Sequence, residues 1–153
     1  MKILKKDYKM ADEVTSYGLV PEANTHVELP VALESIQAGF PAPNGGYIDG
    51  NLDVNEFLVN SPSSTYIYRV SGESMIEAGI MPGDFVLVDS SVKPENGDVV
   101  VACVDGEYTI KELRLKPKPK LVPRNREYPE VEITENSVVV IVGPVISVVR
   151  KYH

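Results

Sequence analysis

The pattern of apolar and polar positions changes near residue 64. From there to the C-terminus, short runs rich in β-branched and aromatic residues alternate with turn signals, which is typical of β-strands. The expected strands are residues 64–70, 84–89, 98–104, 107–115 and 138–149. Asp105-Gly106 lies between two of them and favours a two-residue hairpin turn. The pattern therefore predicts a mainly β domain with many short strands.

The residues before these strands follow a different pattern. Asp53 and Glu56 are three positions apart at the start of an apolar stretch, which resembles a capping box and predicts one short helix over 53–59. Repeated glycine and proline in 31–47 prevent a continuing helix there. Residues 1–30 show neither helical nor strand periodicity, so we expect them to form an extended arm.

Composition narrows the class of protein. The chain has 153 residues, enough for one domain, with a net charge of −7. An acidic surface repels nucleic-acid phosphates, so direct sequence-specific DNA binding is not expected. One stretch, 114–126, is strongly basic. We interpret it as a solvated sheet edge, with a contact site for an acidic partner as the alternative.

Cysteine, histidine and hydropathy exclude further classes. Cys103 is the only cysteine, so no intramolecular disulfide or cysteine metal cluster is expected, and it is interpreted as a small core residue. Only His26 and His153 could supply imidazole, and the sequence gives no sign of a metal or organic cofactor. No apolar run reaches the length of a membrane span, so we expect a cytoplasmic protein.

Ser74, in "VSGESMIEAG" (70–79), is a candidate nucleophile. A serine hydroxyl needs a base at neutral pH, and with the histidines remote in sequence a neutral lysine is the strongest alternative. Lys111 lies in the expected strand 107–115, and burial can lower the pKa of a lysine by several units. By the period of two, Lys111 shares its face with Thr109, Leu113 and Leu115. Taken singly, however, such a lysine is usually a solvated edge charge and such a serine a turn residue.

Four blocks carry a resemblance to a known family. "IQAGFPAP" (36–43), "SGESM" (71–75), "PGDFVLVD" (82–89) and "NGDVVVACVDGEYTIKEL" (96–113) occur in the order and spacing of the LexA/UmuD family of self-cleaving serine–lysine peptidases. The resemblance implies a compact β-rich fold of the LexA and signal-peptidase type. It also implies that Ser74 is the nucleophile, that Lys111 is the general base, and that Ala38-Gly39 is the cleaved bond. Residues 1–38 would then be a regulatory arm and 39–153 the peptidase domain.

Acyl transfer also needs donors for the developing oxyanion. We expect these to be the backbone N–H groups of Ser74 and Glu73. Thr109 is a candidate for holding the Lys111 amine in position. A substrate carried on the same chain can reach an effective molarity of about 10⁵ M, so no external substrate is required.

The chain most resembles the UmuD-like branch of the family. The repressor branch places a DNA-binding domain of about three helices before the cleaved bond, and the 38 residues before Gly39 are too few and too rich in proline for one. The UmuD-like branch implies a homodimer that cleaves itself when stimulated by a RecA–single-stranded DNA filament in the SOS response. The shortened form would be an accessory subunit of an error-prone, UmuC-like Y-family polymerase. The alternatives are a non-cleaving polymerase-binding module, a phage- or plasmid-borne LexA-like regulator without a DNA-binding domain, and a signal-peptidase-like enzyme.

Overall fold

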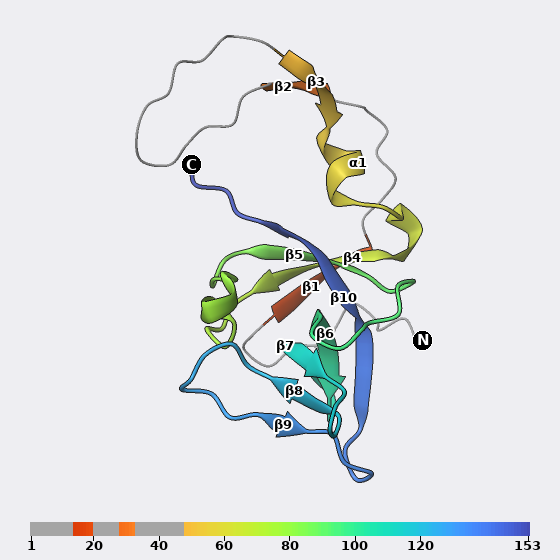
Figure 1. The fold of residues 1–153 in the computed structure, drawn as a ribbon, viewed down its shortest axis with the longest axis vertical. Helices are drawn as coiled ribbons and strands as arrows, with labels where there is room; N and C mark the ends of the chain where they lie inside the picture. The colour runs from red at the N-terminus through yellow and green to blue at the C-terminus, as the bar shows by residue number, and fades with distance from the viewer. Residues whose placement is uncertain (1–13, 20–27, 33–47) are drawn as a thin grey trace.

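The computed structural model describes residues 14–19, 28–32 and 48–153 (Figure 1). Within them lie one α-helix, α1 (Val54–Leu58), and two 3-10 helices, η1 (Pro62–Ser64) and η2 (Ile76–Ala78). The strands are β1 (Val14–Leu19), β2 (Glu28–Ala32), β3 (Ile48–Asp53), β4 (Thr65–Val70), β5 (Phe85–Asp89), β6 (Val99–Val104), β7 (Glu107–Arg114), β8 (Lys120–Val122), β9 (Val131–Glu132) and β10 (Val139–Val149). In this part of the chain, no helix is long and apolar enough to cross a membrane.

Eight of these strands form one antiparallel sheet in the order β1-β4-β5-β10-β6-β7-β8-β9, and β2 and β3 form a separate pair. The first half of β10 pairs with β6, and its second half pairs with β5. Figure 1 shows β10 running the length of the domain between the two groups of strands. The sheet therefore has two halves, β1-β4-β5 and β6-β7-β8-β9, joined through β10.

Gly143 lies where β10 passes from one half to the other. The register with β6 shifts between Ile141 and Gly143, which is the sign of a bulge. A Cβ atom at Gly143 would lie 2.4 Å from the backbone oxygen of Asp89 at the end of β5. Since that atom belongs to the backbone and cannot rotate away, only glycine fits at this crossing.

The mainly β fold expected from the sequence is confirmed. All five expected strands are present, with ends that differ by one residue, and the turn residues Asp105 and Gly106 both have positive φ. The short helix is confirmed as well, because the Asp53 side chain caps it by accepting hydrogen bonds from the Asn55 and Glu56 amides.

Two segments in the N-terminal region differ from the expectation. β1 pairs with β4 at the edge of the main sheet, and β2 pairs with β3, although residues 1–30 carry no strand periodicity. Such pairing uses backbone groups, which every residue has, so it leaves a weak signal in the sequence. Residues 14–19 and 28–32 therefore form strands where the sequence predicted only an arm.

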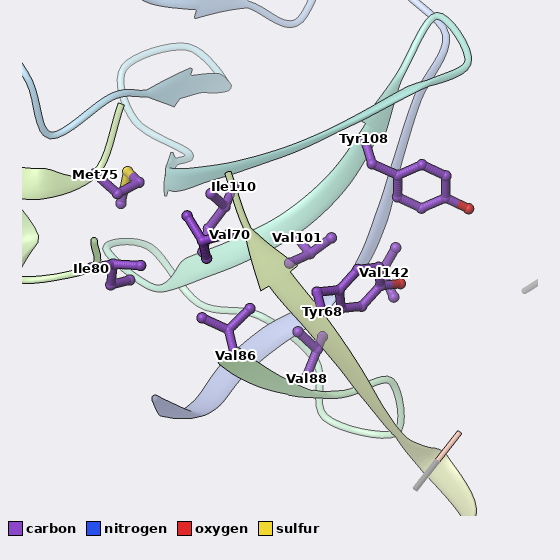
Figure 2. Packing of buried hydrophobic residues seen from close by; sticks show 10 residues of the cluster. All are labelled: Tyr68, Val70, Met75, Ile80, Val86, Val88, Val101, Tyr108, Ile110 and Val142. Carbon is purple, nitrogen blue, oxygen red and sulfur yellow. The ribbon is translucent and has the colours of Figure 1, made fainter. Parts of the chain in front are cut away.

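The main hydrophobic cluster combines residues from both halves of the sheet (Figure 2). Its buried members are Tyr68, Val70, Met75, Ile80, Val86, Val88, Val101, Tyr108, Ile110 and Val142. A second cluster of Val100, Ala102, Leu113 and Leu121 packs on the other face of β6 and β7. Met75 and Ile110 are adjacent in sequence to Ser74 and Lys111, so packing in the main cluster holds the backbone beside both candidate residues.

An ion pair ties the end of the chain to the turn before β5. Both carboxylate oxygens of buried Asp84 accept hydrogen bonds from the Arg150 guanidinium at 2.6 Å, and the Met81 amide donates a third at 2.8 Å. The Arg150 guanidinium also donates to the Gly79 carbonyl at 2.9 Å. The hydrogen bonds from Arg150 lower the pKa of Asp84, outweighing the effect of burial, which raises it.

We therefore expect Asp84→Asn to lower the free energy of unfolding at pH 7 by about 1–3 kcal/mol. The carboxylate contributes fully above the pKa of an unfolded aspartate, about 3.9, and this contribution is lost as the pH falls through the lower pKa of the folded state. Urea unfolding should thus show a larger gap between wild type and variant at pH 7 than at pH 3. The exposed control Glu135→Gln should leave stability at pH 7 unchanged, and an equal gap at both pH values would contradict the assignment.

Candidate active site

Ser74 lies in the turn that leaves β4 and leads into η2. Its side chain is buried, with 2% of the residue exposed. The next residue, Met75, is buried in the main hydrophobic cluster, and the Ile76 amide donates to the Glu73 carbonyl at 3.3 Å. Serine residues in turns are usually exposed, but Ser74 is held inside the domain.

Lys111 lies in β7, opposite Val100 of β6, and is also buried, with 4% exposed. Its Nζ atom is 3.0 Å from Ser74 Oγ, 2.6 Å from Thr109 Oγ1 and 3.1 Å from the Ile110 carbonyl oxygen. The structure thus brings together Ser74, Lys111 and Thr109, three residues singled out in the sequence. Ser74 and Lys111 are within the distance that direct proton transfer requires.

The contacts of Lys111 Nζ can be satisfied by a neutral amine. These three neighbours are two hydroxyls and a carbonyl, all uncharged. A neutral amine has two N–H donors and one lone pair. If its donors serve Thr109 Oγ1 and the Ile110 carbonyl, the lone pair is left for the Ser74 hydroxyl, whose oxygen also lies 3.4 Å from the Ile110 carbonyl oxygen. Burial disfavours the ammonium form of a lysine in the same direction.

The surroundings of Lys111 differ in one respect from the expected strand face. Leu113 is buried as expected, but Leu115 lies beyond the end of β7 and is 43% exposed. Its amide donates to the Asn96 side chain at 2.7 Å, where the chain has left the sheet. The apolar surroundings on this face therefore come from Leu113 together with Val100 of the adjacent strand β6.

The turn around Ser74 has a partner that the sequence did not indicate. The Asn125 side chain, in the segment after β8, donates from Nδ2 to the Glu73 carbonyl at 2.9 Å. The Glu77 amide donates to the Arg124 carbonyl at 2.8 Å. No periodicity or motif marks Asn125, because it lies inside the basic stretch that was interpreted as a solvated edge.

Most of that basic stretch is paired within the chain. Glu112 is in ion-pair contact with Arg114 and, at 3.2 Å, with Arg124 Nε. Two more pairs, Lys120 with Glu130 at 2.7 Å and Arg126 with Glu77 at 3.8 Å, lie on the surface. These ion pairs support the interpretation that the basic residues stabilise the fold, rather than form a contact site for an acidic partner.

Ala38 and Gly39, the bond that is expected to be cleaved, lie outside the described residues. Cys103 is half-buried against the main cluster, and burial is the largest effect raising the pKa of its thiol. Across residues 14–19, 28–32 and 48–153, no group of three or more His, Cys, Asp or Glu side chains is arranged to hold a metal ion.

Comparison with known proteins relates the chain to a peptidase family. A family model described as Peptidase S24-like matches residues 30–146. Protein ImpA of Salmonella typhimurium is 42% identical over 103 residues, covering 67% of this chain and 71% of ImpA. Protein MucA of Escherichia coli is 45% identical over 101 residues, covering 66% of this chain and 69% of MucA.

A more distant relative covers more of the chain. The LexA repressor of an Anaeromyxobacter species is 33% identical over 137 residues, which are 88% of this chain and 58% of that repressor. The higher identities are to ImpA and MucA, which are UmuD-like relatives. The match over most of the chain shows that this protein belongs to the Peptidase S24-like family, as a UmuD-like member.

Proposed function

We propose that this protein is a self-cleaving serine endopeptidase with Ser74 as nucleophile and Lys111 as general base. The observation that carries the proposal is the 3.0 Å contact between Lys111 Nζ and Ser74 Oγ, two polar groups that are both buried. Burying a polar side chain is costly unless it is hydrogen-bonded, and the hydrogen bond that joins this pair has the geometry of a nucleophile beside its base.

The reaction begins when Ser74 Oγ attacks the carbonyl carbon of Ala38 and its proton passes to neutral Lys111. The backbone amides of Ser74 and Glu73 stabilise the resulting oxyanion. Collapse of the tetrahedral intermediate breaks the bond between Ala38 and Gly39, and Lys111 returns the proton to the leaving Gly39 amine. A water molecule, deprotonated by Lys111, then hydrolyses the ester between Ser74 and Ala38, and Ser74 recovers its proton.

Thr109 acts in this scheme as a positioning residue. Its hydroxyl is 2.6 Å from Lys111 Nζ and thereby fixes one of the two N–H directions of the neutral amine. The Ile110 carbonyl fixes the other. With both donors engaged, the lone pair has one direction left, toward Ser74.

Family membership and the resemblance to UmuD-like proteins support a proposal for the cellular role. We propose that the protein is a cytoplasmic homodimer of the SOS response and that a RecA–single-stranded DNA filament stimulates its cleavage. The fragment 39–153 then serves as the accessory subunit of a UmuC-like, error-prone translesion polymerase. The similarity to ImpA and MucA supports this role over that of a repressor.

The test is intact-mass spectrometry of the purified full chain after incubation at pH 7 and at about pH 10. Alkaline pH should speed the release of fragments 1–38 and 39–153, because it increases the neutral fraction of a lysine base. Cleavage at another bond would refute the assignment of Ala38-Gly39. No cleavage at either pH, even with a RecA filament added, would favour a non-cleaving polymerase-binding module instead.

A further inference from the structure

We propose that Asn125 is a positioning residue that sets the direction of the Ser74 backbone amide in the oxyanion site. The proposal rests on the proposed function, in which that amide stabilises the oxyanion. Asn125 lies more than fifty positions from Ser74 in sequence and belongs to the loop after β8. It touches the turn that carries the nucleophile and makes no contact with Ser74 Oγ in the described structure.

The orientation of the Asn125 side chain is fixed at both ends of its amide. The residue is 7% exposed. Its Oδ1 accepts a hydrogen bond from the Glu127 amide at 3.0 Å, and its Nδ2 donates to the Glu73 carbonyl at 2.9 Å. Because a backbone N–H can only donate, the contact with Glu127 identifies which end is the oxygen. The end that faces Glu73 is therefore the donor.

This contact, the shorter of the two that the Glu73 carbonyl accepts beside the 3.3 Å hydrogen bond from the Ile76 amide, helps to set where the Ser74 amide points. The Glu73 carbonyl and the Ser74 N–H belong to one peptide group, which is planar, and the described chain has its cis peptide elsewhere, at Lys116-Pro117. In a trans peptide the C=O and N–H bonds point in opposite directions. Holding the Glu73 oxygen toward Asn125 thus aims the Ser74 N–H away from Asn125. Donation to that oxygen also polarises the peptide and strengthens its N–H as a donor.

The loop that carries Asn125 is itself tied to the strand that carries the base. Arg124 Nε is 3.2 Å from Glu112, the residue after Lys111 in β7. The Arg124 carbonyl accepts from the Glu77 amide, on the far side of Ser74 from Glu73. The 124–125 segment therefore connects the two ends of the Ser74 turn to β7. It thereby holds the Ser74 amide in a fixed position relative to Lys111.

The test compares the rate of self-cleavage of the full chain across pH 7–10.5 for wild type, Asn125→Ala and Asn125→Leu. Leucine has the same number and branching of side-chain heavy atoms as asparagine, so this variant controls for a cavity left by alanine. We expect the maximal rate at alkaline pH to fall roughly 10- to 100-fold in both variants, since a misdirected oxyanion donor costs somewhat less than a deleted one. The pH midpoint should not move, because Lys111 keeps its contacts. Arg126→Ala, which changes a 94%-exposed side chain in the same loop, should cleave at the wild-type rate.

A second measurement is independent of cleavage. Hydrogen bonding to a carbonyl deshields the nitrogen of the same peptide, so losing the Asn125 contact should move the Ser74 ¹⁵N resonance upfield in both variants. A folded variant with an unchanged Ser74 resonance and a maximal rate within twofold of wild type would overturn the proposal. So would a shifted pH midpoint at an unchanged maximal rate, because it would mean that Asn125 acts on the base.

The proposed function and the positioning role of Asn125 can be refuted independently. If the wild type releases no fragments, the proposed function fails, and the Ser74 resonance still decides whether Asn125 directs the amide. If the wild type cleaves through Ser74 while both Asn125 variants keep its rate and resonance, only the positioning role is refuted.

Discussion

Ser74→Ala is expected to abolish release of the fragment 39–153 at every pH. The variant has no atom that can form the acyl-enzyme, and removal of a serine nucleophile lowers turnover by a factor on the order of 10⁶ in a well-studied protease. Intact-mass spectrometry over several days at pH 10 measures the loss. The fold should persist, because Lys111 Nζ keeps its contacts with Thr109 and the Ile110 carbonyl.

The matched control for this variant is Ser63→Ala, which removes an exposed hydroxyl at η1. It should cleave like the wild type. Thermal unfolding of both variants separates loss of chemistry from loss of structure. Fragments of the same mass from folded Ser74→Ala would show that another group, or a contaminating protease, cuts the chain.

Lys111→Met is expected to lower the rate at pH 7 by about 10²- to 10⁴-fold and to remove the acceleration at alkaline pH. Methionine has nearly the length of lysine but carries no proton acceptor of useful strength. The rate of the wild type should rise with pH, because deprotonation of Lys111 creates the base. The slope of log rate against pH between 7 and 10 is therefore the decisive measurement.

Two further observations make this result specific. Lys120→Met removes a lysine that pairs with Glu130 at the surface, and it should keep both the rate and its pH dependence. The free energy of unfolding of Lys111→Met gives an independent test. It should not be lower than that of the wild type, since the substitution removes a buried amine that prefers water. A Lys111→Met variant that keeps the alkaline acceleration would assign the base to another residue.

The strands with strong sequence signals were predictable, and the weak ones were not. β6 and β10 consist largely of valine and isoleucine and β5 of valine, leucine and phenylalanine, all bounded by turns, so composition and spacing define them. β8 and β9 have three and two residues, too few for a period of two to be recognised. β8 forms because it pairs with the edge of β7, and β9 forms because it pairs with β8. This edge exists only in the folded sheet.

The candidate site was predictable only through the resemblance to a family. Ser74 and Lys111 are 37 positions apart, and nothing local reveals that one turn and one strand bring them to 3.0 Å. Lys111 alone cannot be distinguished from a solvated edge lysine, because Tyr108, Ile110 and Glu112 on the other face are buried too. Asn125 could not be found at all, since its proposed role depends on a contact with a backbone carbonyl, which leaves no motif in the sequence.

The position of β10 at the end of the chain has a consequence for the timing of biosynthesis. Ser74 precedes β5 in one half of the sheet, Lys111 lies in β7 of the other, and β10 is the strand that hydrogen-bonds to both halves. Domains are completed in the order in which the ribosome releases their residues. A nascent chain lacking residues 139–149 lacks the strand that joins the two halves by hydrogen bonds, so we expect its pair of Ser74 and Lys111 to be incomplete. If the protein cleaves itself as proposed, we expect a new molecule to be unable to cut its N-terminal residues until its synthesis has passed β10.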